Sequence, residues 1–274
     1  MDYSQILSQQ FNIKEEYAKN IITLLDDGNT IPFIARYRKE MHGSMDDQLI
    51  REFAEKLEYL RGLDKRRDEI RSLIDAQEKL TDEINLALDK AATLSELEDI
   101  YRPYRPKRKT RASIAKEKGL EPLANNILKQ EKGFDPSKSA VDYIDEEKGV
   151  TSVEDAIQGA MDIIAELVSD NAEIRKRIRN LTNANGVLVS VATDEEKDSV
   201  YKNYYDYKEP VKKIAGHRVL AVNRGEKEGF LKVSVETDSE KPLNSIFRAM
   251  ITDKNQLCSD IIREACTDAY QRLI

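Results

Sequence analysis

Basic residues are concentrated in one short stretch of the chain, Y-R-P-Y-R-P-K-R-K-T-R-A-S-I-A-K-E-K at 101–118. This stretch holds eight bases and one acid, a net charge of +7; the whole 274-residue chain carries −7, which leaves −14 elsewhere. A positive patch on an acidic protein gains free energy from released counterions when it meets phosphates. We therefore predict a nucleic-acid contact made by Tyr101, Arg102, Tyr104, Arg105, Lys107, Arg108, Lys109 and Arg111.

The aromatic residues of this stretch add a second kind of contact. Tyr101 and Tyr104 have ring faces on which unpaired bases stack. A competing interpretation needs no ligand: Pro103 and Pro106 stiffen a loop between helices, and its bases pair with acidic neighbouring helices. Both interpretations stay open from sequence.

A second basic turn, A-R-Y-R-K-E, occupies residues 35–40. Here we favour a structural role, in which Arg36 and Arg38 pair with nearby acids and position the following helix. The candidate acids are Glu40, Asp46 and Asp47.

Motifs of common enzymes are missing from the sequence. It contains no G-x-x-x-x-G-K-[ST], G-x-G-x-x-G, G-x-S-x-G or H-E-x-x-H pattern. The neighbouring acids Glu96, Glu98 and Asp99 are more typical of a solvated helix face in a chain with 51 acids. We predict that the chain is not an enzyme and uses no cofactor.

Histidine and cysteine are too few and too scattered for a recognisable zinc site. The chain has two histidines, His42 and His217, and two cysteines, Cys258 and Cys266. The cysteines stand eight residues apart in a predicted helix, about 12 Å along its axis, which is too far for a disulfide. We expect buried free thiols, no metal, and, since no signal or membrane-spanning segment is evident, a cytoplasmic protein.

Helical periodicity dominates the first two thirds of the chain. Apolar residues recur every three or four positions over 46–79 and again from Val153 to about Leu181, which predicts two long helices. Shorter helices are expected at Tyr3–Gln10, Lys14–Leu25, Ile31–Tyr37, Asp82–Ala91, Leu94–Ile100, Ala112–Lys118 and Glu121–Lys129.

The composition changes after Thr182. The β-branched runs Val187–Val191 and Phe230–Val235 predict strands, with a tyrosine-rich connector between them. A helix resumes near Leu243 and continues to Ile274 without a stop signal, so we expect a fragment of a longer protein. The predicted organisation is a helical region at 1–182, a connector with a small β element at 183–240, and a further helical region at 241–274.

The pair of predicted helices within Ala112–Lys129 has the length of a helix-turn-helix unit. Lys118 and Asn125 stand where such helices pack with apolar side chains, and Pro122 limits the second helix. We therefore expect no sequence-specific reading of the DNA major groove by this segment.

Four long stretches together resemble the N-terminal part of the Tex family of bacterial transcription accessory proteins. They are T-I-P-F-I-A-R-Y-R-K-E (30–40), L-S-E-L-E-D-I-Y-R-P-Y-R-P-K-R-K-T-R-A-S-I-A-K-E-K-G-L-E-P-L-A (94–124), A-I-Q-G-A-M-D-I-I-A-E (156–166) and H-R-V-L-A-V-N-R-G-E-K-E-G-F-L (217–231). One departure is Ala215-Gly216, where the family usually has Pro-Ser, which weakens the expected helix cap before His217.

The resemblance implies a multi-domain nucleic-acid-binding protein whose later parts are a degenerate nuclease-like domain, a helix-hairpin-helix region and an S1 domain. It also implies that the leading third to two fifths is an elongated helical scaffold with a helix-turn-helix-type unit. Because the S1 domain supplies most RNA affinity in such a protein, we expect weak binding by this chain.

Our prediction is a mostly α, elongated multi-helix assembly with a small β element near 187–236. Its expected role is a non-catalytic scaffold and auxiliary nucleic-acid-binding region of a transcription or RNA-associated factor. The alternative is a protein-interaction module that docks on RNA polymerase or the ribosome, in which the basic stretch meets an acidic protein surface.

Overall fold

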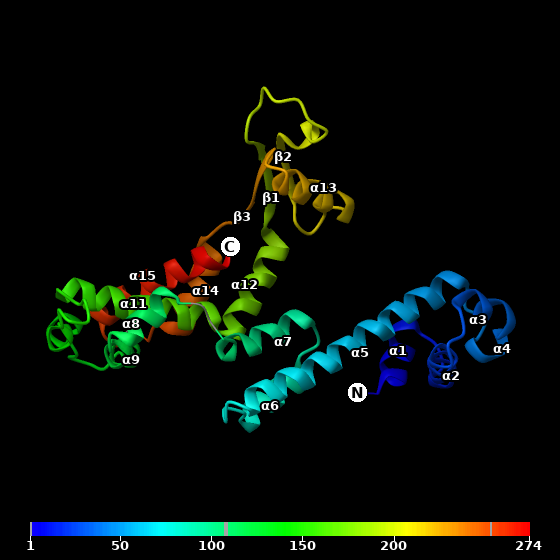
Figure 1. Ribbon diagram of the computed structural model, residues 1–274, viewed down its shortest axis with the longest axis horizontal. Coiled ribbons are helices and arrows are strands. Elements are labelled where there is room, and N and C mark those ends of the chain that lie inside the picture. Colours follow the sequence, from blue (N-terminus) through cyan, green and yellow to red (C-terminus); the bar gives the residue numbers. More distant parts are fainter. Residues whose placement is uncertain (1, 107–108, 253) are drawn as a thin grey trace. The chain divides into compact units, whose positions relative to one another are not determined.

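Helices make up most of the computed structural model, which describes residues 2–106, 109–252 and 254–274 (Figure 1). The expected mostly α fold with a small β element is confirmed. Contacts divide the chain into two compact units, residues 1–104 and 105–274. The three-part organisation expected from composition stays a prediction. Within the described ranges, no helix is both long enough and apolar enough to cross a membrane.

The first unit is built along one long helix. Its elements are α1 (Tyr3–Phe11), α2 (Glu15–Asp26), α3 (Ile31–Tyr37), α4 (Lys39–His42), α5 (Asp47–Asp75), α6 (Asp82–Lys90), α7 (Leu94–Tyr101) and the 3-10 turn η1 (Arg102–Tyr104). The Asp46 side chain caps α5 by accepting the Leu49 N–H at 2.8 Å. The first half of α5 packs on α1–α3, and its second half forms a separate core with α6 and α7.

The second unit has a helical core and a small sheet. Its helices are α8 (Arg111–Glu117), α9 (Glu121–Lys129), α10 (Pro136–Ala140), α11 (Val153–Asp170), α12 (Ala172–Asn185), α13 (Gly216–Lys227), α14 (Glu240–Met250) and α15 (Gln256–Leu273), with 3-10 turns η2 (Val141–Tyr143) and η3 (Lys202–Tyr204). Helices α8, α9, α11, α14 and α15 share one core. A Cβ at Gly159 of α11 would lie 2.3 Å from Leu120 Cδ1, so the missing side chain permits this close packing.

Two expected helices are interrupted, and the sequence predictions were wrong there. The predicted helix from Val153 to about Leu181 is two helices, because Asn171 takes an extended backbone and its side chain caps α12 through the Ile174 N–H at 3.0 Å. The predicted helix from Leu243 onward is likewise α14 followed by α15, and the Asn255 side chain caps α15. Both breaks follow from asparagine side chains that satisfy a free N–H at a new helix start.

The sheet is antiparallel in the order β2-β1-β3 and stands beside α13 (Figure 1). Strands β1 (Val187–Ala192) and β3 (Leu231–Glu236) match the expected runs, whereas β2 (Asp206–Pro210) lies in what was expected to be a connector. Helix α13 begins after Ala215 without a side-chain cap, as the departure from the family pattern predicts.

Candidate nucleic-acid interface

The predicted interface is divided between the two units. Residues 101–104 end the first unit in α7 and η1, and Arg105 begins the second unit. Lys107 and Arg108 lie outside the described residues.

Tyr101 belongs to the core and not to the surface. Its side chain is 6% exposed in the cluster formed by α5, α6 and α7, and the Arg66 guanidinium lies 5.6 Å from its ring centroid. Arg66 also donates to Glu98 at 2.7 Å, which fixes it over the ring. A ring held in this way offers no face to a nucleic-acid base, so stacking by Tyr101 requires a different conformation.

Tyr104 is half-buried against the same core. Its carbonyl accepts a hydrogen bond from Gln77 Nε2 at 2.9 Å, which ties η1 to the end of α5. The backbone of this tyrosine is therefore positioned, and its ring remains the better candidate for base stacking.

The exposed bases Arg102, Arg105 and Lys109 differ in their partners. Arg102 is exposed in η1 and has an intramolecular partner. Lys109 is 68% exposed and its Nζ lies 3.5 Å from Glu117, a loose surface pair that competes weakly with a phosphate. Arg105 is exposed and forms no hydrogen bond or ion pair with the described part of the chain.

Arg111 is the base most firmly held by acids. Its Nη2 donates to both carboxylate oxygens of Asp268 at 3.0 Å, and its Nε lies 3.5 Å from Asp162. Arg272 contacts the same two carboxylates. Two bases and two acids thus cancel locally at the junction of α8, α11 and α15, as the pairing interpretation of this stretch predicts.

The C-terminal bases of the stretch are also engaged within the protein. Lys116 pairs with Glu121 at 2.9 Å, and Lys118 donates to the Gly149 carbonyl at 2.7 Å. Arg105 and Lys109 are therefore the described bases of 101–118 whose charge is best available to a ligand.

The expected ion pairs of the turn at 35–40 were wrong. Arg38 donates to the Tyr37 carbonyl at 3.3 Å and its guanidinium lies 5.3 Å from the Phe33 ring centroid. Asp47 pairs instead with Arg51 at 3.2 Å, one helical turn along α5. Arg38 therefore packs on an aromatic ring rather than on an acid.

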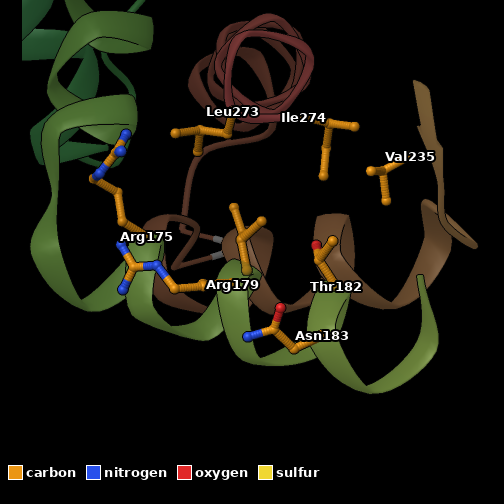
Figure 2. Close-up of a pocket in the computed structure, with 8 residues that line it drawn as sticks. Arg175, Arg179, Thr182, Asn183, Val235, Leu273 and Ile274 are labelled. Atoms are coloured by element: carbon orange, nitrogen blue, oxygen red, sulfur yellow. The ribbon is translucent and has the colours of Figure 1, made fainter. Parts of the chain in front are cut away.

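A further basic run, R-K-R-I-R at 175–179, was not predicted as a site, although its density of bases is visible in the sequence. It lies on α12, and a groove there is lined by Arg175, Ile178, Arg179, Thr182, Asn183, Val235, Leu273 and Ile274 (Figure 2). Arg175 donates to the Ser169 carbonyl at 3.1 Å, and Arg179 also has an intramolecular interaction. These arginines thus serve the packing of α12 first.

The residues considered for metal binding lie in separate places. His42 is buried in α4, and its Nε2 lies 3.1 Å from the Ile34 carbonyl. The thiols of Cys258 and Cys266 are free and buried, as expected, and burial raises the pKa of Cys266 to about 12. Among residues 2–106, 109–252 and 254–274, no three His, Cys, Asp or Glu side chains gather into a group able to hold a metal ion.

Comparison with known proteins gives two family matches. Residues 1–75 match the Tex-like protein N-terminal domain, and residues 131–272 match the Tex central region-like family.

Curated relatives cover nearly the whole chain. It is 43% identical to protein YdcI of Bacillus subtilis over 100% of its own length, 38% identical to the transcriptional accessory protein Tex of Neisseria gonorrhoeae over 86%, and 31% identical to the human S1 RNA-binding domain-containing protein 1 over 85%. The chain spans 39%, 31% and 24% of these relatives, respectively.

Proposed function

This chain belongs to the Tex family, and from that premise we propose that it is a scaffold and auxiliary nucleic-acid-binding region of a transcription accessory protein, without catalytic activity of its own. The names of its relatives support a role near nucleic acid: one is a transcriptional accessory protein, and another carries an S1 RNA-binding domain. A cytoplasmic location accords with that role.

The observation that carries the proposal is the unequal engagement of the basic stretch. Acids hold Arg111 and Lys116, while Arg105 is exposed without a described partner and Lys109 has only a loose one. Exposed bases contribute most to phosphate binding, because they break few contacts within the protein and still release the counterions of the phosphate. The contact is thus centred on 105–109, narrower than the sequence predicts.

The proposed contact is too small for tight binding. A few phosphate contacts give the affinity of a non-specific site, which suits an auxiliary role beside other nucleic-acid-binding parts. None of the described bases of 105–109 is placed on a helix that could enter the major groove, so we propose backbone contacts without sequence preference.

Charge reversal tests this proposal. The triple variant Arg105→Glu, Lys107→Glu, Arg108→Glu should bind a labelled 20-nucleotide single-stranded RNA at least about ten-fold more weakly than the parent at low salt. The matched control reverses three exposed lysines elsewhere in the chain, Lys65, Lys79 and Lys132, and changes net charge equally. Equal loss in both variants would leave only a general charge effect and would refute a local contact.

A further inference from the structure

The stretch 217–231 is prominent in the sequence, and the nucleic-acid proposal leaves it without a role. Helix α13 covers most of it and packs against β3. A Cβ at Gly225 would lie 2.6 Å from Leu231 Cδ1, so the helix approaches the strand closely at this glycine. Val222 on the same side is fully buried. One face of α13 is thereby fixed against the sheet.

Two acids near α13, Glu226 and Glu209, are hydrogen-bonded within this part of the protein. Glu226 Oε1 accepts the Val233 N–H of β3 at 3.3 Å. Glu209 of β2 receives two hydrogen bonds from Arg218 Nη1, at 2.9 and 3.0 Å, and another from the Tyr207 hydroxyl. The hydrogen bonds from Tyr207 and Arg218 lower the pKa of Glu209 below its ordinary value. These carboxylates therefore do not neutralise the opposite face.

The outer face carries a different set of side chains. His217, Leu220, Arg224 and Lys227 follow one another at intervals of three, four and three residues, which places them on one side of the helix. All four are exposed, and Leu220 is 70% exposed. We call these four residues the α13 outer stripe. Within the described chain, Arg224 and Lys227 form no ion pair.

Two further lysines lie close in sequence to the start of α13. Lys212 and Lys213 are exposed in the turn that joins β2 to α13. The α13 outer stripe thus presents Leu220 among bases, while Glu226 and Glu209 are hydrogen-bonded to β3 and to Arg218. Glu228, which follows the helix, is exposed and interacts with Tyr201. Such a combination fits a partner that is acidic and also offers apolar surface to Leu220.

We propose that the α13 outer stripe is a docking site for an acidic amphipathic helix of a partner protein. The acidic side chains of that helix face Arg224, Lys227 and the lysines of the turn, and its apolar side chains cover Leu220. A phosphate–sugar backbone would satisfy the bases but would leave Leu220 in water, whereas the apolar side chains of an amphipathic helix would cover it. The proposal does not depend on the contact at 105–109.

Two peptides of identical composition separate patterned docking from simple charge attraction. The first is a labelled 20-residue helical peptide of Glu, Asp and Leu with leucines at every third or fourth position; the second has the same residues with leucines scattered around the helix. Fluorescence anisotropy on the whole chain should show at least about ten-fold tighter binding of the patterned peptide. Equal binding of the two peptides would overturn the proposal.

Variants of the stripe locate the site. Leu220→Ala should weaken binding of the patterned peptide about ten-fold. The double variant Arg224→Glu, Lys227→Glu should weaken it by at least as much. The controls are Leu257→Ala, which truncates another exposed leucine of the same unit, and Lys132→Glu with Lys138→Glu. Circular dichroism verifies that each variant keeps the parent's helical content.

Three results would contradict the proposal. The first is peptide binding unaffected by the stripe variants, and the second is loss that is equal in the controls. The third is RNA binding at the stripe. In that case a 20-nucleotide RNA displaces the peptide, and its affinity depends on Arg224 and Lys227 but is unchanged by Leu220→Ala.

Discussion

Arg111 and Asp268 lie 157 residues apart in sequence and are joined by two hydrogen bonds of 3.0 Å between one guanidinium nitrogen and both carboxylate oxygens. The pair connects the first turn of α8 to the last turns of α15. Arg111, a base of the predicted interface, therefore has a structural partner. The positive charge of a residue in this stretch does not by itself make it available to a nucleic acid.

Arg111→Ala should therefore affect stability more than binding. Because the Arg111 side chain is 58% exposed, solvent screens the pair, and we expect the free energy of unfolding to fall by about 1 kcal/mol or less. RNA affinity should change less than about two-fold, since a phosphate would have to displace a carboxylate. Urea unfolding measures the change in stability, and fluorescence anisotropy measures the change in RNA affinity. A large loss of affinity without a change in stability would show that Arg111 contacts the RNA.

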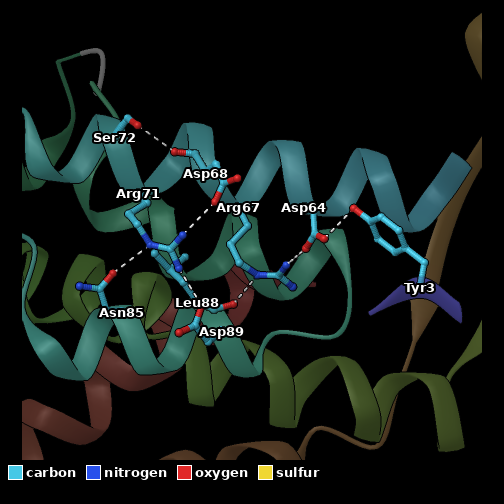
Figure 3. Close-up of polar contacts among 9 residues, drawn as sticks. All are labelled: Tyr3, Asp64, Arg67, Asp68, Arg71, Ser72, Asn85, Leu88 and Asp89. Atoms are coloured by element: carbon cyan, nitrogen blue, oxygen red, sulfur yellow. Dashed lines mark hydrogen bonds and ion pairs between the residues drawn. The ribbon is translucent and has the colours of Figure 1, made fainter. Parts of the chain in front are cut away.

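Arg67 and Arg71 offer a matched test of burial within α5 (Figure 3). Arg67 is 6% exposed, donates to the carbonyls of Leu88 and Ala91 at 2.9 Å each, and contacts Asp64. Arg71 also forms three hydrogen bonds, with Asn85, Asp89 and Asp68. Its two carboxylate partners are, however, well exposed to solvent.

Arg67→Met should lower the free energy of unfolding of the first unit by about 3 kcal/mol, because it removes two buried hydrogen bonds to carbonyl groups and the positive charge that faces Asp64. Arg71→Met should lower it by about 1 kcal/mol or less. Thermal or urea unfolding compares the two variants directly. Equal effects would show that the bonds of Arg67 are not energetically special.

Tyr101→Ala should destabilise the first unit by about 3 kcal/mol, since it removes a buried ring from the core and uncovers Arg66. Tyr104→Ala removes a half-buried ring and should have the smaller effect on stability. If Tyr104 stacks on a base, its loss weakens the binding of single-stranded RNA by about 1–3 kcal/mol and leaves the binding of duplex RNA unchanged. A stable Tyr101→Ala variant that binds RNA less well would instead support stacking by Tyr101.

Burial makes the thiol of Cys266 a poor nucleophile. Its pKa is raised to about 12 by desolvation, whereas the unfolded chain keeps the ordinary value near 9. The thiolate therefore favours the unfolded state, and stability should be lost as pH rises from about 9 toward 12. Alkylation at pH 8 should be slow in the native chain and fast in denaturant, with Cys266→Ala as the control. Equal rates in both conditions would contradict the buried position.

Local sequence signals predicted the helix positions well because caps and apolar spacing act over a few residues. Ser152 caps α11 and Thr93 caps α7, as residue types at helix starts indicate. The break at Asn171 was missed because the apolar spacing continues through it, and periodicity does not report a cap. Strand β2 was missed because its five residues, DYKEP, gain their strand conformation from pairing with β1.

The sequence shows where the bases are concentrated but not which of them are engaged within the protein. Composition locates the bases of 101–118, whereas their partners come from residues as distant as Asp268. Burial of Tyr101 depends on the core of α5, α6 and α7, which a count of aromatic residues does not reveal. The α13 outer stripe requires knowledge of which helix face meets the sheet.

The salt dependence of RNA binding tests the central claim most directly. Affinity of the parent for a 20-nucleotide single-stranded RNA should fall linearly on a plot of log affinity against log salt, with about 0.7 in slope for each phosphate contact. Reversal of Arg105, Lys107 and Arg108 to Glu should flatten the slope by about 2, and reversal of Lys65, Lys79 and Lys132 should leave it unchanged. A folded triple variant at 105–108 with the parent's affinity and slope would contradict the account and leave the basic stretch as a structural loop.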